Sequence, residues 1–140
     1  MSNTTPQLYA SLSVALGGGI GALARYQLGR FMTAWLGPNI VMTFPFPTLA
    51  VNAIGSLLMG LLAGWLALRG DGLGMQGDQL RLLLGVGLLG GFTTFSAFSL
   101  EMVLLLERGN YGLAGLYVLL SLGLCFSGLM IGLMLTRLFS

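Results

Sequence analysis

The sequence predicts an all-α integral membrane protein with four transmembrane helices, and its composition supplies the main reasons. Of the 140 residues, 56% are hydrophobic, and only six basic and four acidic residues are charged. A soluble domain carries charge on roughly a quarter of its residues, whereas the 7% found here is too little to cover a surface that faces water. Uncharged runs at 1–24, 31–68, 82–100 and 109–136 reach the ~18 residues that span a bilayer.

The four helices are expected at about 8–30, 47–68, 80–106 and 112–137, to within about 2–4 residues. The run 31–68 is too long for one span, and glycine and proline at 37–39 and 45–47 interrupt its start. Short connections are predicted at Leu36–Phe46, Arg69–Gln79 and Arg108–Tyr111. Residues 1–140 are therefore expected to form a single four-helix transmembrane domain.

Missing residue types exclude several classes of function. The chain has no histidine and one cysteine, Cys125, which excludes metal sites of the His/Cys kind and Ser-His catalysis. The scattered arginines do not form a nucleic-acid footprint, and the sequence has no phosphate-binding glycine-lysine loop. We therefore expect neither an enzyme nor a nucleic-acid-binding protein.

The first helix is rich in glycine and carries arginine near its end. Gly17 and Gly21 are small residues four positions apart, as are Gly18 and Ala22, and this spacing lets two helices approach closely. Arg25 follows Gly21 by one turn. Its guanidinium either snorkels to the membrane surface or points into an aqueous vestibule.

Polar side chains recur at every fourth position in the second and fourth helices, which places each set on one helix face. The two stripes are Thr48, Asn52 and Ser56, and Tyr117, Ser121 and Cys125. An amide in a bilayer is costly unless it is paired, so Asn52 either holds two helices together by a hydrogen bond or belongs to a polar track. The two stripes together indicate polar rails that face each other.

The third helix contains the most unusual segment, Gly90-Gly91-Phe92-Thr93-Thr94-Phe95-Ser96-Ala97-Phe98-Ser99. Two glycines followed by two β-branched threonines form a poor helix. We expect this helix to be broken in mid-membrane, where non-helical backbone lines a cavity or binds an ion; a merely kinked helix is the alternative. Glu101 follows, and an acid inside a membrane is a functional candidate by default.

Three stretches of the chain resemble the Fluc fluoride channel family, also called CrcB-like proteins. They are Gly17–Tyr26, Thr48–Gly55 and Gly90–Ser99, and the similarity spans all four helices in order. The third stretch is the specific one, because the glycines of the first helix would not indicate the family alone. The resemblance implies a fluoride-selective anion channel of the bacterial inner membrane, built as an antiparallel, dual-topology homodimer with two pores.

The resemblance also implies roles for individual residues. A central sodium ion that is not transported would be held by the backbone carbonyls of Gly90 and Thr93. The expected fluoride pathway comprises the matching family positions and nearby hydrogen-bond donors: Asn52, Phe95, Phe98, Tyr117, Ser121, Thr48, Thr94, Ser96 and Arg25. Cys125 departs from the family, some of whose members carry serine there. A thiol is a weaker donor than a hydroxyl, so this position is not expected to be essential.

These residue types suit fluoride, a small anion that holds its water tightly. Amides, hydroxyls and guanidinium groups donate hydrogen bonds, and the edge of a phenyl ring is the positive part of its quadrupole. The sequence places no stack of lysine or arginine in mid-pore, and conduction needs sites that an ion can leave. A passive channel would let fluoride leave the cytoplasm down its electrochemical gradient without ATP.

Two other classes of protein remain open. A small proton-coupled exporter of cationic drugs shares the size and the dual topology, but it needs a membrane acid, usually early in its first helix. This chain has arginines there, and its candidate acid is Glu101. A non-conducting membrane scaffold is the second alternative, although it would not require Asn52, a broken helix and two polar stripes together.

The distribution of arginine predicts that both orientations insert into the membrane. Orientation follows the excess of lysine and arginine in short loops. Four spans place Arg69, Arg81 and Arg137 on one side, and Arg30 and Arg108 on the other, joined by Arg25 if it sits near the helix end. Neither side has a strong excess, so an upright and an inverted copy would pair about a two-fold axis in the membrane plane.

Overall fold

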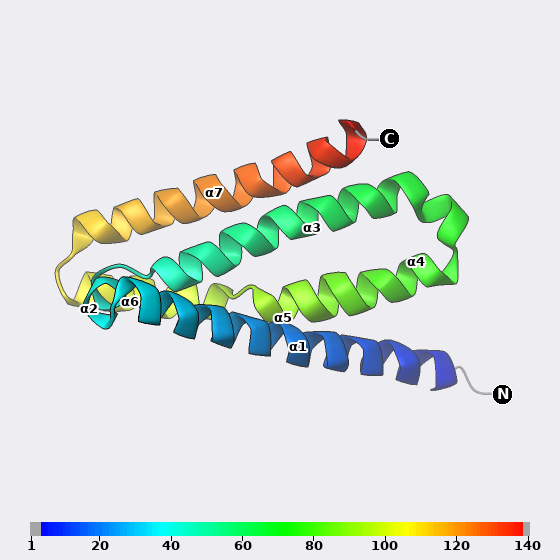
Figure 1. Ribbon diagram of the computed structural model, residues 1–140, viewed down its shortest axis with the longest axis horizontal. Helices are drawn as coiled ribbons and strands as arrows, with labels where there is room; N and C mark the ends of the chain where they lie inside the picture. Colours follow the sequence, from blue (N-terminus) through cyan, green and yellow to red (C-terminus); the bar gives the residue numbers. More distant parts are fainter. Residues whose placement is uncertain (1–3, 139–140) are drawn as a thin grey trace.

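The computed structural model describes residues 4–138, and this part of the chain is helical apart from short connections and the extended Thr93 and Thr94 (Figure 1). Its helices are α1 (Thr4–Leu36), α2 (Pro38–Thr43), α3 (Phe46–Leu73), α4 (Met75–Leu80), the π-helix η1 (Arg81–Leu89), α5 (Gly90–Phe92), α6 (Phe95–Glu107) and α7 (Tyr111–Leu138). Four segments are long and apolar enough to cross a membrane: Gln7–Leu36, Phe46–Arg69, Met75–Glu107 and Tyr111–Leu138. The prediction of an all-α chain with four membrane-spanning helices is confirmed.

The four spans run up and down beside one another (Figure 1). α3 packs along α7, and α1 packs along η1 and α5. The start of α1, the α3–α4 turn and the end of α7 lie at one end of the bundle. α2 and the turn between α6 and α7 lie at the opposite end.

The connection between the first two spans is more ordered than predicted. α1 continues past the expected end at residue 30 to Leu36 and stops at Gly37, whose φ of 90° is readily available to glycine alone. The expected loop Leu36–Phe46 contains the short helix α2, which begins at Pro38. Proline favours the first helical position because the amide hydrogen that it lacks would be unpaired there.

The prediction of a loop at Arg69–Gln79 is wrong. α3 continues to Leu73 and α4 begins at Met75, so Gly74 alone separates the two helices. This glycine has φ 47° and ψ −129°, and it reverses the chain in one residue. The segment is polar and rich in glycine, which predicts a loop, but a glycine costs a helix only about 1 kcal/mol. The turn expected at Arg108–Tyr111 is present, with Gly109 at φ 74°.

The third span does not keep one helical geometry. α4 passes into the π-helix η1, α5 ends at Phe92, and Thr93 and Thr94 then have extended backbone, with ψ of 160° and 119°. Gly90 is helical, at φ −65° and ψ −37°, so the backbone leaves the helix at the threonines rather than at the glycines. α6 begins at Phe95, and the Thr94 side chain caps it by accepting the amide hydrogen of Ala97 at 3.2 Å.

The glycines of α1 let it lie against the third span backbone to backbone. A Cβ atom on Gly17 would strike the carbonyl oxygen of Leu83, and one on Gly21 would strike that of Leu88. A Cβ on Gly91 would in turn strike the backbone of α1. The predicted packing role of the first-helix glycines is confirmed, because only small residues permit this approach.

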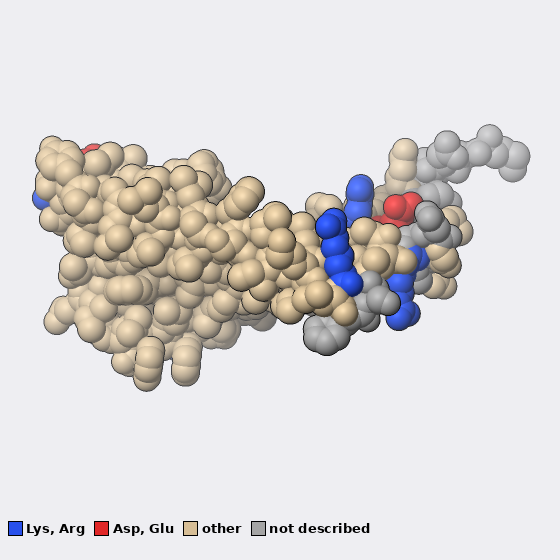
Figure 2. All heavy atoms as spheres, turned by 90° about the horizontal axis from the view of Figure 1, so that it is seen from above, with Lys and Arg blue, Asp and Glu red and all other residues tan. Residues whose placement is uncertain are grey.

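Most of the apolar surface is exposed in a single chain. The side chains of Leu16 in α1 and Phe126 in α7 are 65% and 72% exposed. The buried core is small: Phe44, Leu49, Leu105, Ala114 and Tyr117 form one cluster, and Val51 and Leu89 are also buried. On the face drawn in Figure 2, charged side chains gather toward the ends of the molecule and leave a long uncharged stretch between them. Such a surface suits lipid and partner helices rather than water.

Candidate functional site

Glu101 of α6 lies where three helices meet. Its Oε1 atom accepts a hydrogen bond from Thr48 Oγ1 of α3 at 2.7 Å, and its Oε2 atom accepts one from the Tyr117 hydroxyl of α7 at 2.7 Å. Thr48 is 8% exposed and Tyr117 is wholly buried. We call these three residues the Glu101 junction. It joins α3, α6 and α7 through one carboxyl group.

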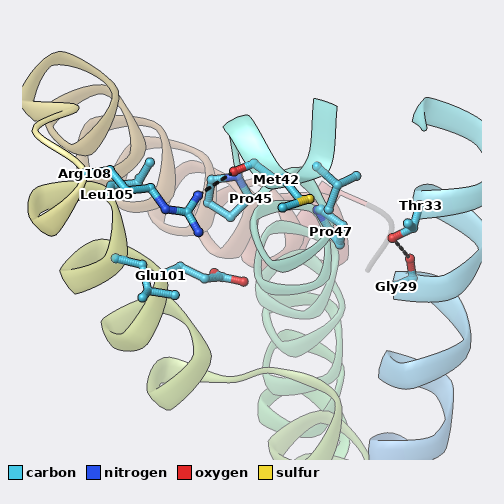
Figure 3. Close-up of a pocket in the computed structure, with 10 residues that line it drawn as sticks. Gly29, Thr33, Met42, Pro45, Pro47, Glu101, Leu105 and Arg108 are labelled. Atoms are coloured by element: carbon cyan, nitrogen blue, oxygen red, sulfur yellow. Dashed lines mark hydrogen bonds between the residues drawn. The ribbon is translucent and has the colours of Figure 1, made fainter. Parts of the chain in front are cut away.

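A cavity of about 340 Å³ opens beside this junction (Figure 3). Its lining comes from α1, the α2 region and α6: Gly29, Thr33, Val41, Met42, Pro45, Pro47, Glu101, Leu104, Leu105 and Arg108. Arg108 Nη1 donates to the Met42 carbonyl oxygen at 2.9 Å and so ties the end of α6 to α2. The cavity therefore has an acid and a guanidinium group in its wall, at the end of the bundle where α2 lies.

The interrupted part of the third span borders a second cavity, of about 320 Å³, which we call the central pocket. It is lined by Asn52, Gly55, Ser56, Met59, Thr93, Thr94, Phe95, Phe98, Ser121, Leu122, Cys125 and Leu129. The α3 members follow the spacing i, i+3, i+4, i+7 of one helix face. The polar stripes of α3 and α7 thus contribute Asn52, Ser56, Ser121 and Cys125 to the wall of the same cavity.

Asn52 holds the extended backbone at Thr94. Its Nδ2 atom donates to the Thr94 carbonyl oxygen at 2.9 Å, and its Oδ1 atom accepts the Thr94 amide hydrogen at 2.8 Å. In a continuous helix that amide would bond to the carbonyl of Gly90. The side chain of Asn52 therefore substitutes for helical hydrogen bonds at the point where the helix stops.

Aromatic rings connect the central pocket to the Glu101 junction. The ring centroids of Phe95 and Phe98 are 5.6 Å apart, and those of Phe98 and Tyr117 are 5.0 Å apart. Phe44 meets Tyr117 edge-on at 5.5 Å. Phe95 is 79% exposed, so most of its side chain is not covered by protein in a single chain.

Ser121 lines the central pocket and carries a buried hydroxyl group. Its side chain is 8% exposed, and its Oγ atom has no hydrogen-bond partner within the described part of the chain. Buried polar groups are nearly always hydrogen-bonded. Ser121 Oγ is therefore a buried hydroxyl whose donor and two acceptor lone pairs are unused within the described residues.

Arg25 lines a smaller cavity together with Gly29, Pro47, Thr48, Val51, Thr94 and Ala97. This cavity shares Thr94 with the central pocket and Thr48 with the Glu101 junction. The guanidinium group also borders a more open hollow with Tyr26 and Arg30. Arg25 thus contributes to cavity walls between α1 and the spans that carry the polar stripes.

Cation binding by acidic or sulfur side chains has no support among residues 4–138, where no three His, Cys, Asp or Glu residues are grouped to hold a metal ion. Backbone oxygen is a different kind of ligand. Gly90 is exposed in the single chain, and the Thr94 amide hydrogen goes to Asn52 instead of to the Gly90 carbonyl. The donor set expected for sodium, the Gly90 and Thr93 carbonyls, therefore fits a hard monovalent cation in its chemistry.

The structure brings the predicted site residues into neighbouring places. The central pocket takes Asn52, Thr94, Phe95, Phe98 and Ser121, the smaller cavity takes Arg25 and Thr48, and Ser96 Oγ is hydrogen-bonded to Thr94 Oγ1 at 3.2 Å. The sequence marks Glu101 only as an acid within an apolar region. Its partners Thr48 and Tyr117 are 53 and 16 positions away, and no spacing rule indicates those contacts.

Four apolar spans with cavities between them define a multi-pass membrane protein. The chain belongs to the CrcB-like family, because the family model described as "CrcB-like protein, Camphor Resistance (CrcB)" matches residues 12–133.

Curated relatives match almost the whole chain. A protein of Erythrobacter litoralis named "Fluoride-specific ion channel FluC" is 59% identical over 99% of this chain and 99% of its own length. Proteins of the same name from Novosphingobium aromaticivorans and Phenylobacterium zucineum are 56% and 52% identical, over 91% and 93% of this chain and 96% and 97% of their own lengths. The chain is thus a bacterial multi-pass membrane protein without enzymatic activity.

Proposed function

We propose that the protein is a fluoride-selective channel through which fluoride leaves the cytoplasm passively across the bacterial inner membrane. The observation that carries the proposal is a set of hydrogen-bond donors in two cavities that share Thr94, with Arg25 in one and Asn52 and Ser121 in the other. The relatives' names support fluoride as the ion, because those proteins are named fluoride-specific ion channels.

The donors along these cavities match what a strongly hydrated anion needs. Fluoride must exchange its water for protein donors at each step. Arg25 would attract the anion at one end, the Thr94 and Ser96 hydroxyls would follow, and Ser121 has no internal partner that an anion would have to displace. The Thr48 hydroxyl would serve the anion only by leaving its bond to Glu101 Oε1. Because Arg25 is the only positively charged donor among these groups, the anion is not bound too tightly to leave again.

Phe95 and Phe98 would supply the narrow apolar part of the path. Their rings lie 5.6 Å apart beside the extended threonines, and an aromatic edge carries partial positive charge. Tyr117 would border the same path with its ring, because its hydroxyl proton is donated to Glu101 Oε2. Because Glu101 already accepts from both Thr48 and Tyr117, we assign it a positioning role.

A second copy of the chain would complete the channel. We place the interruption at Thr93 and Thr94 in mid-membrane and pair the exposed side around Gly90 and Phe95 with an inverted copy, which gives an antiparallel homodimer with two pores. A two-fold axis duplicates each ligand, so the Gly90 and Thr93 carbonyls of both chains would surround one sodium ion. When bound, that ion would supply fixed positive charge that stabilises the dimer.

A flux measurement separates this proposal from its alternatives. Purified protein is placed in liposomes loaded with potassium fluoride, and efflux is followed with a fluoride electrode while valinomycin lets potassium leave. We expect rapid fluoride efflux without a coupled ion. Exchange of a cationic drug for protons would instead establish an exporter, and absence of any flux would establish a scaffold.

The antiparallel arrangement has its own test, based on the positive-inside rule. Two lysines are added within 70–78 in one variant, and two beside Asn110 in another. Each should take a single orientation, lose activity alone and regain it when both are co-expressed. Full activity of either variant alone, with uniform topology demonstrated, contradicts the antiparallel dimer.

A further inference from the structure

Gly29 of α1 borders three cavities. It lines the cavity beside the Glu101 junction, the smaller cavity that contains Arg25, and the more open hollow on α1. The first and the last also take residues from α2, at one end of the bundle (Figure 1). The smaller cavity shares Thr94 with the central pocket. Gly29 is therefore placed between the end of the bundle and the interrupted third span.

The packing of α1 changes along one stripe of residues. Five residues recur at every fourth position and form a continuous stripe that winds slowly around the helix: Gly17, Gly21, Arg25, Gly29 and Thr33. At the first two, a Cβ atom would strike the backbone of η1. At Gly29, a Cβ atom would meet open space, with no packed atom within 4 Å. The stripe thus begins against the third span and opens into the cavities at Gly29.

The walls beside Gly29 offer an anion little in exchange for its water. Pro47 of α3 borders the same two cavities, the one beside the Glu101 junction and the smaller one. Glycine has no side chain, and the proline ring carries no donor. The Thr33 hydroxyl donates to the Gly29 carbonyl oxygen at 2.8 Å (Figure 3), so its hydrogen is already used. An anion beside these three residues keeps its own water.

We infer that fluoride enters between Gly29 and Pro47 together with its water, and that the absence of a side chain at Gly29 sets the width of this entrance. Exchange of water for protein donors begins one helical turn further in, at Arg25. A side chain at Gly29 narrows the entrance and makes the ion shed water where no donor replaces it. This inference rests on the proposed function, whereas exposure of Gly29 to water does not.

Variants of Gly29 test the width of the entrance. Fluoride efflux from liposomes is measured for Gly29→Ala and Gly29→Met, with folding checked by thermal melting and size-exclusion chromatography. Both should fold, because the added Cβ atom enters open space and glycine is a poor helix former. Efflux should fall with side-chain size, roughly tenfold or more for methionine, which corresponds to a barrier raised by ~1.4 kcal/mol.

Gly29→Gln separates lost water from lost space. Its side chain resembles that of methionine in length and shape but ends in an amide that donates hydrogen bonds. It should therefore retain more efflux than Gly29→Met. Equal efflux of the two variants would overturn the claim that fluoride passes Gly29 with its water.

Gly123→Met is the matched control for the width. Gly123 of α7 is exposed, and a Cβ atom there would also meet open space. It lies two residues after Ser121, or roughly 200° around the helix, and so faces away from the central pocket. This variant should keep the efflux of the unmodified protein. The inference is overturned if folded Gly29→Met conducts like the unmodified protein, or if Gly123→Met loses as much efflux.

Thiol labelling tests the water-filled entrance without fluoride. Gly29→Cys and Gly123→Cys are each made together with Cys125→Ser, and the liposomes are treated with a charged methanethiosulfonate. Intact-protein mass spectrometry follows the labelled fraction. Gly29→Cys should react several-fold faster, because the reactive thiolate forms in water, and equal rates overturn the entrance. If the unmodified protein moves no fluoride, the proposed function and the width claim fail together, while labelling still decides whether Gly29 faces water.

Discussion

The Glu101 junction offers the sharpest mutational test, through Tyr117→Phe. This change removes one oxygen atom and keeps the ring. The lost hydroxyl donates to Glu101 Oε2 at 2.7 Å. Tyr117 is wholly buried, so no other protein donor reaches this position and Oε2 loses its donor from α7.

The size of the effect follows from that burial. Hydrogen bonds between membrane helices contribute only about 0.6 kcal/mol on average, because partners are also found in the unfolded state. A buried acceptor left unsatisfied costs about 1–3 kcal/mol. We expect Tyr117→Phe to lower the free energy of unfolding by about 1–3 kcal/mol. Each ~1.4 kcal/mol shifts the unfolding equilibrium roughly tenfold. Fluoride efflux should fall as well.

The assay is a double-mutant cycle of Tyr117→Phe and Thr48→Val, with the free energy of unfolding measured in detergent. Both donors use the same carboxyl group, so the two changes should be non-additive by about 0.5–3 kcal/mol. Tyr111→Phe is the matched control, since Tyr111 also lies in α7 but is 71% exposed. Strict additivity, or a loss no larger than that of the control, would refute the junction.

Three further predictions concern the central pocket and the interruption of the third span. Phe95→Ile and Phe98→Ile keep apolar bulk but remove the ring edge, so fluoride efflux should fall sharply with dimer assembly intact on size-exclusion chromatography; wild-type efflux in both removes the rings from the mechanism. Asn52→Ala removes both side-chain bonds to the Thr94 backbone and leaves the Thr94 amide hydrogen without its acceptor, so it should lower thermal stability together with efflux; an unchanged melting temperature would contradict the Asn52 contacts. Gly90→Val should abolish activity and Thr93→Ser should be mild, because the proposed sodium ligands are backbone oxygens, and normal conduction by protein prepared entirely without sodium or lithium contradicts the ion.

Local pattern predicted the spans and the polar faces but not their contacts. Thr48, Asn52 and Ser56 recur with helical period, and the structure places Asn52 and Ser56 on one cavity wall. The bond from Asn52 to the Thr94 backbone joins two spans, and its geometry depends on where α3 meets the interrupted helix. Periodicity within one helix gives no information about where that helix contacts another span.

The turns show a similar limit. Residues 69–79 combine glycine, arginine and aspartate, a composition typical of loops, yet only Gly74 leaves the helix. The whole segment Gly90–Thr94 was expected to be a poor helix, and within it the structure uses Gly91 for contact with α1 and leaves the helix at Thr93 and Thr94. Low helix propensity locates an unusual segment, but tertiary packing decides which of its residues leaves the helix.

Current recorded across a planar bilayer tests the central claim, passive and selective fluoride conduction, most directly. With a tenfold fluoride gradient and equal pH on both sides, the current should reverse near the fluoride equilibrium potential, about 59 mV in magnitude. On the side with less fluoride, another anion keeps the total salt concentration equal. Replacing that anion with chloride should leave the reversal potential unchanged. A reversal potential that follows chloride, or one that shifts with a proton gradient at constant fluoride, would contradict a fluoride-selective channel.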